Sequence, residues 1–193
     1  EKSWLKNESV SIAIQVRMGD YTSISPEEQH ILNTTYDERI PYHILDLFWD
    51  TAKEQAEKEV QKRGMKYASF FIATDSALVR EYARWAFREQ NLHFTSGKFR
   101  HSDLDGLDRE TNLKMLADWY LISRADLVIQ GPWSTYVEKA LLNSSKKQQI
   151  FRCHNLNGET KYMNISMVSY KDDWGCFINI LQDTSKGPRA VDH

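Results

Sequence analysis

The segment SVSIAIQV at residues 9–16 is a short apolar run of the kind that forms a strand buried on both faces of a parallel sheet. The chain continues directly into Arg17, Met18, Gly19 and Asp20. A charged residue after a strand is often only a solvated cap. The alternative is that Arg17 belongs to a binding site, and this depends on which other segments meet the end of the strand.

Segments of the same character recur along the chain and alternate with helical patterns, which is typical of βαβ units. We therefore predict an α/β, Rossmann-like fold, with at least four strands in a mostly parallel sheet and helices on both faces. The expected strands are 9–16, 67–73, 126–129 and 149–153, with a weaker candidate at 92–96. The expected helices lie between Pro41 and Gly64, from Asp75 or Ser76, from Thr111, and from near Ser134.

Apolar residues three to four positions apart indicate which face of each helix is buried. In the helix that begins at Thr111, this pattern predicts that Leu113, Leu116, Ala117 and Tyr120 face the core.

The length of 193 residues suits a single domain, and 41% hydrophobic residues are enough to fill its core. We assign residues 1–183 to one domain, and we expect 184–193 to be a flexible tail. A formal net charge of -2 gives no indication of a nucleic-acid partner. The sequence has no apolar run of membrane-spanning length, and we expect none of its segments to be a signal peptide. Because it begins with Glu1 rather than Met, we expect it to be a piece of a longer protein.

The cellular compartment is indicated by glycosylation acceptors and by two cysteines. Asn7, Asn33, Asn143 and Asn164 each begin an Asn-x-Ser/Thr sequence. Cys153 and Cys176 are either two buried thiols or one disulfide. The acceptor sequences favour a lumenal or extracellular setting, in which the two cysteines could be bridged.

Polar segments follow three of the expected strands. They are QVRMGD at 15–20, ATDS at 73–76 and QGPWST at 130–135. Ligands of open parallel sheets bind outside the carboxyl ends of the strands, so these turns should converge on one site.

The side chains in these turns suit a nucleotide. Arg17 offers a fork of donors for phosphate oxygens. Ser134 and Thr135 stand at a helix start, which favours anions. Asp75 could accept hydrogen bonds from a guanine edge or a ribose hydroxyl. Each residue also has a simpler interpretation: Ser134 and Asp75 as helix caps, Arg17 as a strand cap.

Other chemistries find little support in the sequence. The Gly-rich motifs of P-loop ATPases and dinucleotide-binding proteins are absent, as is the Gly-x-Ser-x-Gly elbow of hydrolases. The histidines show no metal-ligand spacing, so we expect neither a metal nor another cofactor.

The three turns resemble, in order and spacing, the motifs of the fucosyltransferase superfamily, which joins α1,2-, α1,6- and protein O-fucosyltransferases. SIAIQVRMGDY resembles its His-x-Arg-Arg-(Gly)-Asp motif. FFIATDSALVREYA resembles the second motif, and LADWYLISRADLVIQGPWSTYVEKALL the third. The resemblance covers residues 9–142. It implies the donor-binding half of a GT-B glycosyltransferase, which transfers fucose from GDP-fucose with inversion and without a bound metal. Residues 1–183 would then be its nucleotide-sugar (donor) binding domain.

The resemblance also implies roles for individual residues. Arg17 falls on the motif arginine that holds the β-phosphate and would be the catalytic residue. Gln15 falls on the motif histidine beside the base, and Asp75 on the aspartate that contacts guanine. Ser134 and Thr135 fall on a pair of phosphate-side hydroxyls. The remaining donor-binding residues of the three turns would be Gly19, Asp20, Ser76 and Gly131.

This chain departs from the family pattern at several positions. Met18 replaces the second arginine, and Gln15 replaces the histidine. Glu27 and Glu28 follow the first motif, where the family has a carboxylate proposed as base, but the alignment singles out neither.

The enzyme interpretation implies a glycan or glycoprotein acceptor, a missing N-terminal acceptor-binding domain, and a location in the Golgi or ER lumen. Two alternatives stay open: a non-catalytic nucleotide- or glycan-binding module of the same fold, and an unrelated doubly wound domain with no nucleotide site.

Overall fold

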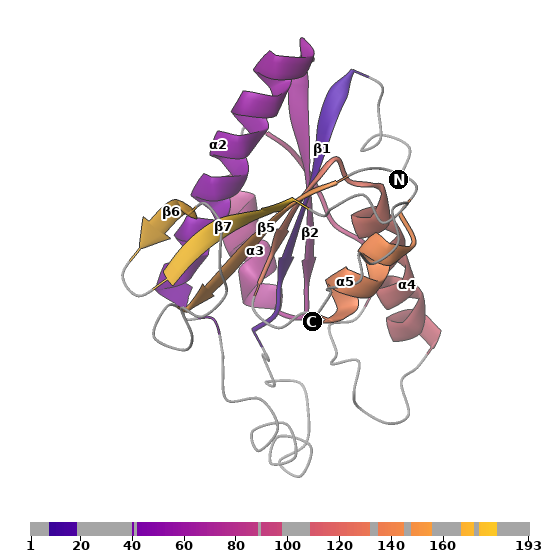
Figure 1. Ribbon diagram of the computed structural model, residues 1–193. Coiled ribbons are helices and arrows are strands. Elements are labelled where there is room, and N and C mark those ends of the chain that lie inside the picture. The colour runs from indigo at the N-terminus through magenta and orange to yellow at the C-terminus, as the bar shows by residue number, and fades with distance from the viewer. Residues whose placement is uncertain are drawn as a thin grey trace, which may run out of the picture.

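The computed structural model describes residues 8–18, 40, 42–88, 90–97, 109–131, 135–144, 148–155, 167–171 and 174–180. These segments form one seven-stranded sheet with the strand order β3-β2-β1-β4-β5-β7-β6 (Figure 1). The strands are β1 (Ser9–Val16), β2 (Tyr67–Thr74), β3 (Asn91–His93), β4 (Leu127–Gln130), β5 (Gln149–Asn155), β6 (Met167–Lys171) and β7 (Trp174–Ile180). The helices are the short 3-10 helix η1 (Tyr42–Ile44), α2 (Leu45–Arg63), α3 (Ala77–Ala86), α4 (Arg109–Arg124) and α5 (Thr135–Leu142).

The first five strands of this order are parallel, which confirms the predicted mostly parallel sheet. β7 adds to β5 in antiparallel orientation, and β6 pairs antiparallel with β7. The sequence did not lead us to expect either of these two strands. They extend the sheet on the side away from β2 and β3.

Helices cover both faces of the sheet, as predicted, because successive side chains of each strand point to opposite faces. Ile12 and Ile14 of β1 pack in one core cluster with side chains of α2 and α3. Ala13, between them, packs in a second cluster with side chains of α4 and α5. Figure 1 shows α2 and α4 on opposite sides of the strands.

The ends of α2 and α3 follow from local sequence signals. Gly64 ends α2 in the left-handed conformation, with φ of 62°, and its N–H bonds back to the carbonyls of Val60 and Gln61. Glycine adopts this conformation without the steric cost of a Cβ. Ser76 caps α3, and its hydroxyl accepts from Val79 N at 3.4 Å. The predicted end of α2 and start of α3 therefore hold within one or two residues, whereas α2 begins at Leu45, after η1, rather than at Pro41.

The predicted buried face of α4 is wrong. Leu113, Leu116 and Tyr120 are 55%, 63% and 49% exposed. The buried face instead carries Lys114 and Asp118, together with other side chains. The physical reason is that a charged pair occupies core-facing positions, so the apolar periodicity marks the wrong side of the helix. The residues buried along α4 are Thr111, Lys114, Asp118, Leu121, Ile122 and Ser123.

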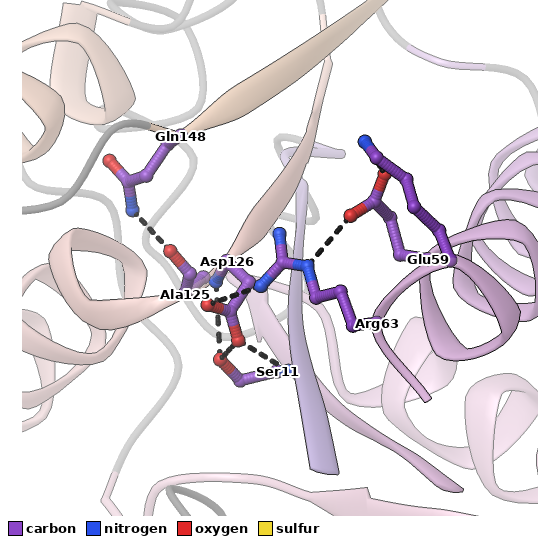
Figure 2. A network of polar contacts seen from close by, with 7 residues as sticks. Ser11, Glu59, Arg63, Ala125, Asp126 and Gln148 are labelled. Carbon is purple, nitrogen blue, oxygen red and sulfur yellow. Dashed lines mark hydrogen bonds and ion pairs between the residues drawn. The ribbon is translucent and has the colours of Figure 1, made fainter. Parts of the chain in front are cut away.

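A polar network joins α2, β1 and β4 at the amino ends of the strands (Figure 2). The Asp126 carboxylate accepts from Ser11 N at 2.9 Å and from Ser11 Oγ at 2.6 Å. The Arg63 guanidinium donates to the same carboxylate at 3.1 Å and to the Glu59 carboxylate at 2.8 Å. Gln148 donates to the Ala125 carbonyl at 2.7 Å. This network fixes the sheet at the edge opposite to the one where the predicted site lies.

Cys153 and Cys176 form a disulfide between β5 and β7, which joins the antiparallel strands to the parallel sheet. Both side chains are fully buried. None of the helices within the described segments is both long and apolar enough to cross a membrane. The expected tail at 184–193 lies outside the described residues.

Candidate functional site

The candidate site lies at the carboxyl ends of the central strands, where the order of the sheet reverses. β2 and β3 follow β1 on one side, and β4 and β5 lie on its other side. The reversal point is therefore between β1 and β4, and open α/β sheets bind ligands outside the strands at such a point. Two of the three predicted turns leave the sheet here, and the third leaves from β2 beside β1.

Gln15 is the residue at the reversal point itself. It pairs with Gln130 in the register of β1 and β4, and both are buried, Gln15 being 7% exposed. They continue the pleat of Ala13 and Val128, which face α4 and α5. Within the described segments, the side-chain oxygen Oε1 of Gln15 has no hydrogen-bond partner.

Gly131 leaves space beside this oxygen. Its N–H extends the sheet by donating to the carbonyl of Gln15 at 3.1 Å. A Cβ at position 131 would lie 3.7 Å from Gln15 Oε1 and 3.2 Å from the side chain of Ile40. A larger residue would thus press against Ile40 and contact the buried Gln15 oxygen.

Asp75 fastens the first turn to the second. Its Oδ1 accepts from the backbone N–H of Met18 at 2.9 Å, across the ends of β1 and β2. The cap of α3 is Ser76, so Asp75 is not the capping residue. Asp75 is thereby placed against the residue that follows Arg17.

Arg17 and Thr135 stand at the predicted positions along the chain. Arg17 directly follows β1 and is half-buried. Thr135 begins α5, four residues after Gly131. Gly19, Asp20 and Ser134 lie outside the described residues, as do Glu27 and Glu28. The structure therefore brings Arg17, Gln15, Asp75, Ser76 and Gly131 to one edge of the sheet.

The side chain of Met18 is directed into the core. It is 5% exposed and packs in the cluster shared with α2 and α3. The fucosyltransferase motif has its second arginine at this position. Met18 therefore provides no positive charge at the edge of the sheet.

A buried charged pair behind the second turn was not found from the sequence. Lys114 Nζ lies 2.6 Å from Asp118 Oδ2, with side chains only 7% and 8% exposed. The other carboxylate oxygen accepts from Thr95 Oγ1. Lys114 also donates to the carbonyl of Thr74, the last residue of β2, at 3.4 Å. The available signal was the Lys-Asp spacing of four residues on one helix, which is also common on solvated faces.

Burial controls the electrostatics around this pair. Burial raises the pKa of Asp118, although the Lys114 ammonium and the Thr95 hydroxyl oppose the shift. Burial, together with the nearby charge of Asp118, also raises the pKa of Tyr136. The Tyr136 hydroxyl donates to the carbonyl of Met115, which joins α5 to α4.

Among the described residues, no group of three or more His, Cys, Asp or Glu side chains is arranged to hold a metal ion. The groups at the strand ends are instead a guanidinium, a carboxylate, amides and backbone N–H groups. Such groups recognise an anionic ligand that also offers hydrogen-bond donors.

No protein-family model and no curated protein matches the chain. Its structure is similar to solved fucosyltransferases. One is NodZ from Bradyrhizobium, with 17% identity over 76% of this chain and 38% of that chain, at a TM-score of 0.40. Another is the NodZ α-1,6-fucosyltransferase soaked with GDP-fucose, with 17% identity over 78% and 40% of the two chains and a TM-score of 0.41.

A mutant of FUT1 from Arabidopsis thaliana in complex with GDP is similar at 18% identity, with a TM-score of 0.41. There the alignment covers 78% of this chain and 30% of that chain. The chain thus spans well under half the length of these solved proteins.

Proposed function

We propose that this chain is the donor-binding portion of a fucosyltransferase, which binds GDP-fucose and transfers fucose with inversion and without a bound metal. The observation that carries the proposal is the convergence of the motif turns on the reversal point of the sheet. Arg17, Gln15 and Asp75 come from two strands and lie at one edge. The ordered resemblance of these turns to fucosyltransferase motifs supports the same ligand.

The groups at this edge suggest how a nucleotide would be held. The Arg17 guanidinium and the start of α5 suit the diphosphate. The unpartnered oxygen of Gln15 accepts from an N–H or O–H group of the nucleoside. Asp75, whose Oδ1 holds Met18 N, also accepts from the guanine edge.

Transfer with inversion forms one bond and breaks another at the anomeric carbon. The acceptor hydroxyl attacks this carbon and loses its proton to a carboxylate base, while the bond to the β-phosphate oxygen breaks. The electron pair of that bond stays on the phosphate, whose negative charge increases. Arg17 beside this phosphate stabilises the transition state more than the bound substrate.

The remaining components of the proposal concern parts beyond this site. The acceptor is a glycan or glycoprotein, bound by a further N-terminal domain. The protein works in the lumen of the ER or Golgi. The exposed side chain of Asn143 and the disulfide support this location.

Calorimetric titration with GDP tests the donor site. We expect GDP to bind more tightly than ADP or UDP, because Asp75 and Gln15 recognise the base. Equal affinity for the three nucleotides would contradict guanine recognition. Absence of binding to any of them would contradict the nucleotide site itself.

A non-catalytic nucleotide-binding module is the second candidate. The burial of Met18 favours it, because the edge then has one motif arginine where the family pattern has two. Incubation of the full-length protein with GDP-fucose separates the two functions. Release of GDP supports the enzyme, whereas GDP binding without turnover supports the module.

A further inference from the structure

The buried Lys114–Asp118 pair lies where four parts of the fold meet. Lys114 and Asp118 belong to α4, and Thr95 belongs to the segment after β3. Arg80 of α3 and Tyr136 of α5 are near enough to feel the charge of Asp118. The pair is thus enclosed by groups from several elements rather than lying on a solvated helix face.

Burying a charged pair in the core has a cost in free energy. Two charges lose their hydration on burial, and apolar side chains of similar volume are often as stable or more so. The main chain also approaches this part of α4 closely. Gly97 adopts a φ of 119°, and a Cβ there would lie 2.8 Å from the Cβ of Lys114. Stability alone therefore gives a poor account of this arrangement.

The contacts of the pair lead to the candidate site in three steps. Lys114 Nζ donates to the carbonyl of Thr74 at 3.4 Å. The hydroxyl of Thr74 accepts from Ser76 N at 3.1 Å. The residues before and after Asp75 are therefore both held by hydrogen bonds. Asp75 in turn holds the N–H of Met18 at 2.9 Å, directly after Arg17.

We propose that Lys114 and Asp118 are positioning residues, which fix the turn after β2 so that Asp75 holds the end of β1 and sets the position of Arg17. Asp118, held by Thr95, fixes the ammonium of Lys114 in place. Lys114 then anchors the turn through the Thr74 carbonyl. The consequence for donor binding rests on the proposed function, whereas the anchoring of the turn does not.

Hydrogen exchange of the Met18 amide, followed by NMR, tests the anchoring without any ligand. The variant Lys114→Met with Asp118→Leu replaces the pair by apolar side chains of similar size. We expect it to stay folded and the Met18 amide to exchange roughly tenfold faster or more, relative to the Ile14 amide inside β1. A purely structural role would accelerate both amides together and leave their ratio unchanged.

GDP titration of the same variant tests the consequence for the site. We expect its affinity to fall by roughly tenfold or more. If the wild-type chain binds no GDP, the proposed function fails, while the Met18 exchange ratio still decides the positioning role. A folded double variant with an unchanged ratio overturns the proposal.

Two further variants complete the experiment. Glu54 and Lys58 form a matched pair on α2, also four residues apart with a 2.6 Å contact, but about half exposed. Lys58→Met with Glu54→Leu should leave the Met18 ratio and GDP binding unchanged, and a change in either would overturn the proposal. Should the buried double variant not fold, Thr95→Val removes only the hydroxyl that holds Asp118. We expect a smaller increase in the ratio, and its absence would equally contradict the positioning role.

Discussion

At the scale of single residues, the end of β1 places a core residue, Met18, next to a candidate ligand residue, Arg17. Met18 points into the core, while its N–H is held by Asp75. Arg17, one residue earlier, is half-buried at the edge of the sheet. These two contacts of Met18 do not involve the Arg17 side chain, so a substitution at Arg17 leaves them in place.

The first prediction concerns Arg17 in the full-length protein. Arg17→Lys keeps the charge but loses the fork of donors, so we expect donor turnover to fall by about tenfold or more. Arg17→Ala should nearly abolish turnover and leave the melting temperature within a few degrees. Unfolding of Arg17→Ala, or unchanged turnover, would mean that Arg17 is only a strand cap.

The second prediction separates the contact of Asp75 with Met18 N from its proposed contact with guanine. Asp75→Asn keeps an oxygen that can accept from Met18 N but loses the charge offered to guanine. We expect GDP binding to weaken by about 1.5–3 kcal/mol, with a much smaller effect on pyrophosphate, measured by calorimetry. Equal losses for the two ligands would assign Asp75 to the positioning of the turn alone.

At the scale of secondary structure elements, α4 separates what sequence periodicity can predict from what it cannot. Each buried central strand is a continuous apolar run, so its position was readable from the sequence. In α4, Lys114 and Asp118 occupy core positions while Leu113 and Leu116 are exposed. Periodicity cannot reveal this, because Lys114 and Asp118 form an i, i+4 pair that is also common on a solvated helix face. Their further partners, Thr95 and the Thr74 carbonyl, lie outside α4.

The antiparallel strands β6 and β7 were missed although the sequence offers a signal for them. They lie on either side of Asp172-Asp173, and a two-residue spacing is typical of a hairpin. The candidate site was more predictable than these strands. Gln15, Arg17 and Asp75 are close in space because parallel strands end at a common edge, which follows from the strand pattern alone.

The third prediction tests which face of α4 is buried. Leu116→Lys should change the free energy of unfolding by no more than about 0.5 kcal/mol, because the side chain is already in solvent. Ile122→Ala should cost roughly 2–5 kcal/mol, because Ile122 is fully buried against the sheet. Urea unfolding measures both. A large cost at Leu116 would show that the face predicted from the apolar periodicity is buried after all.

The fourth prediction concerns the disulfide between β5 and β7. The two cysteines are 23 residues apart, and closing a loop of that length restricts the unfolded chain. Cys153→Ala with Cys176→Ala should therefore lower the free energy of unfolding by about 3 kcal/mol. GDP affinity should not change, because the bond lies at the side of the sheet away from β2. A loss of affinity in a folded variant would contradict this separation.

At the scale of the whole molecule, the two edges of the sheet have different tasks. Arg63 and Asp126 connect α2 to β4 at the amino edge, and Ser11 brings in β1 (Figure 2). The carboxyl edge holds the candidate ligand groups. Sites at opposite ends of the strands should contribute nearly independently. Stability and ligand binding are therefore separable by mutation.

The last prediction applies this separation to acid stability. Burial alone would raise the pKa of Glu59, but hydrogen bonds from Lys62 and Arg63 outweigh it, so the pKa is lowered from its ordinary value of 4.5. A carboxyl whose pKa is lowered by folding contributes stability above its unfolded pKa, and this contribution is lost as the pH falls through the folded value. The stability difference between wild type and Glu59→Gln, measured by urea unfolding, should therefore be largest near pH 7 and shrink below about pH 4.5. GDP affinity at pH 7 should be the same in both proteins. A difference that stays constant with pH would show that Glu59 acts by packing, and altered GDP affinity would show that the two edges are coupled.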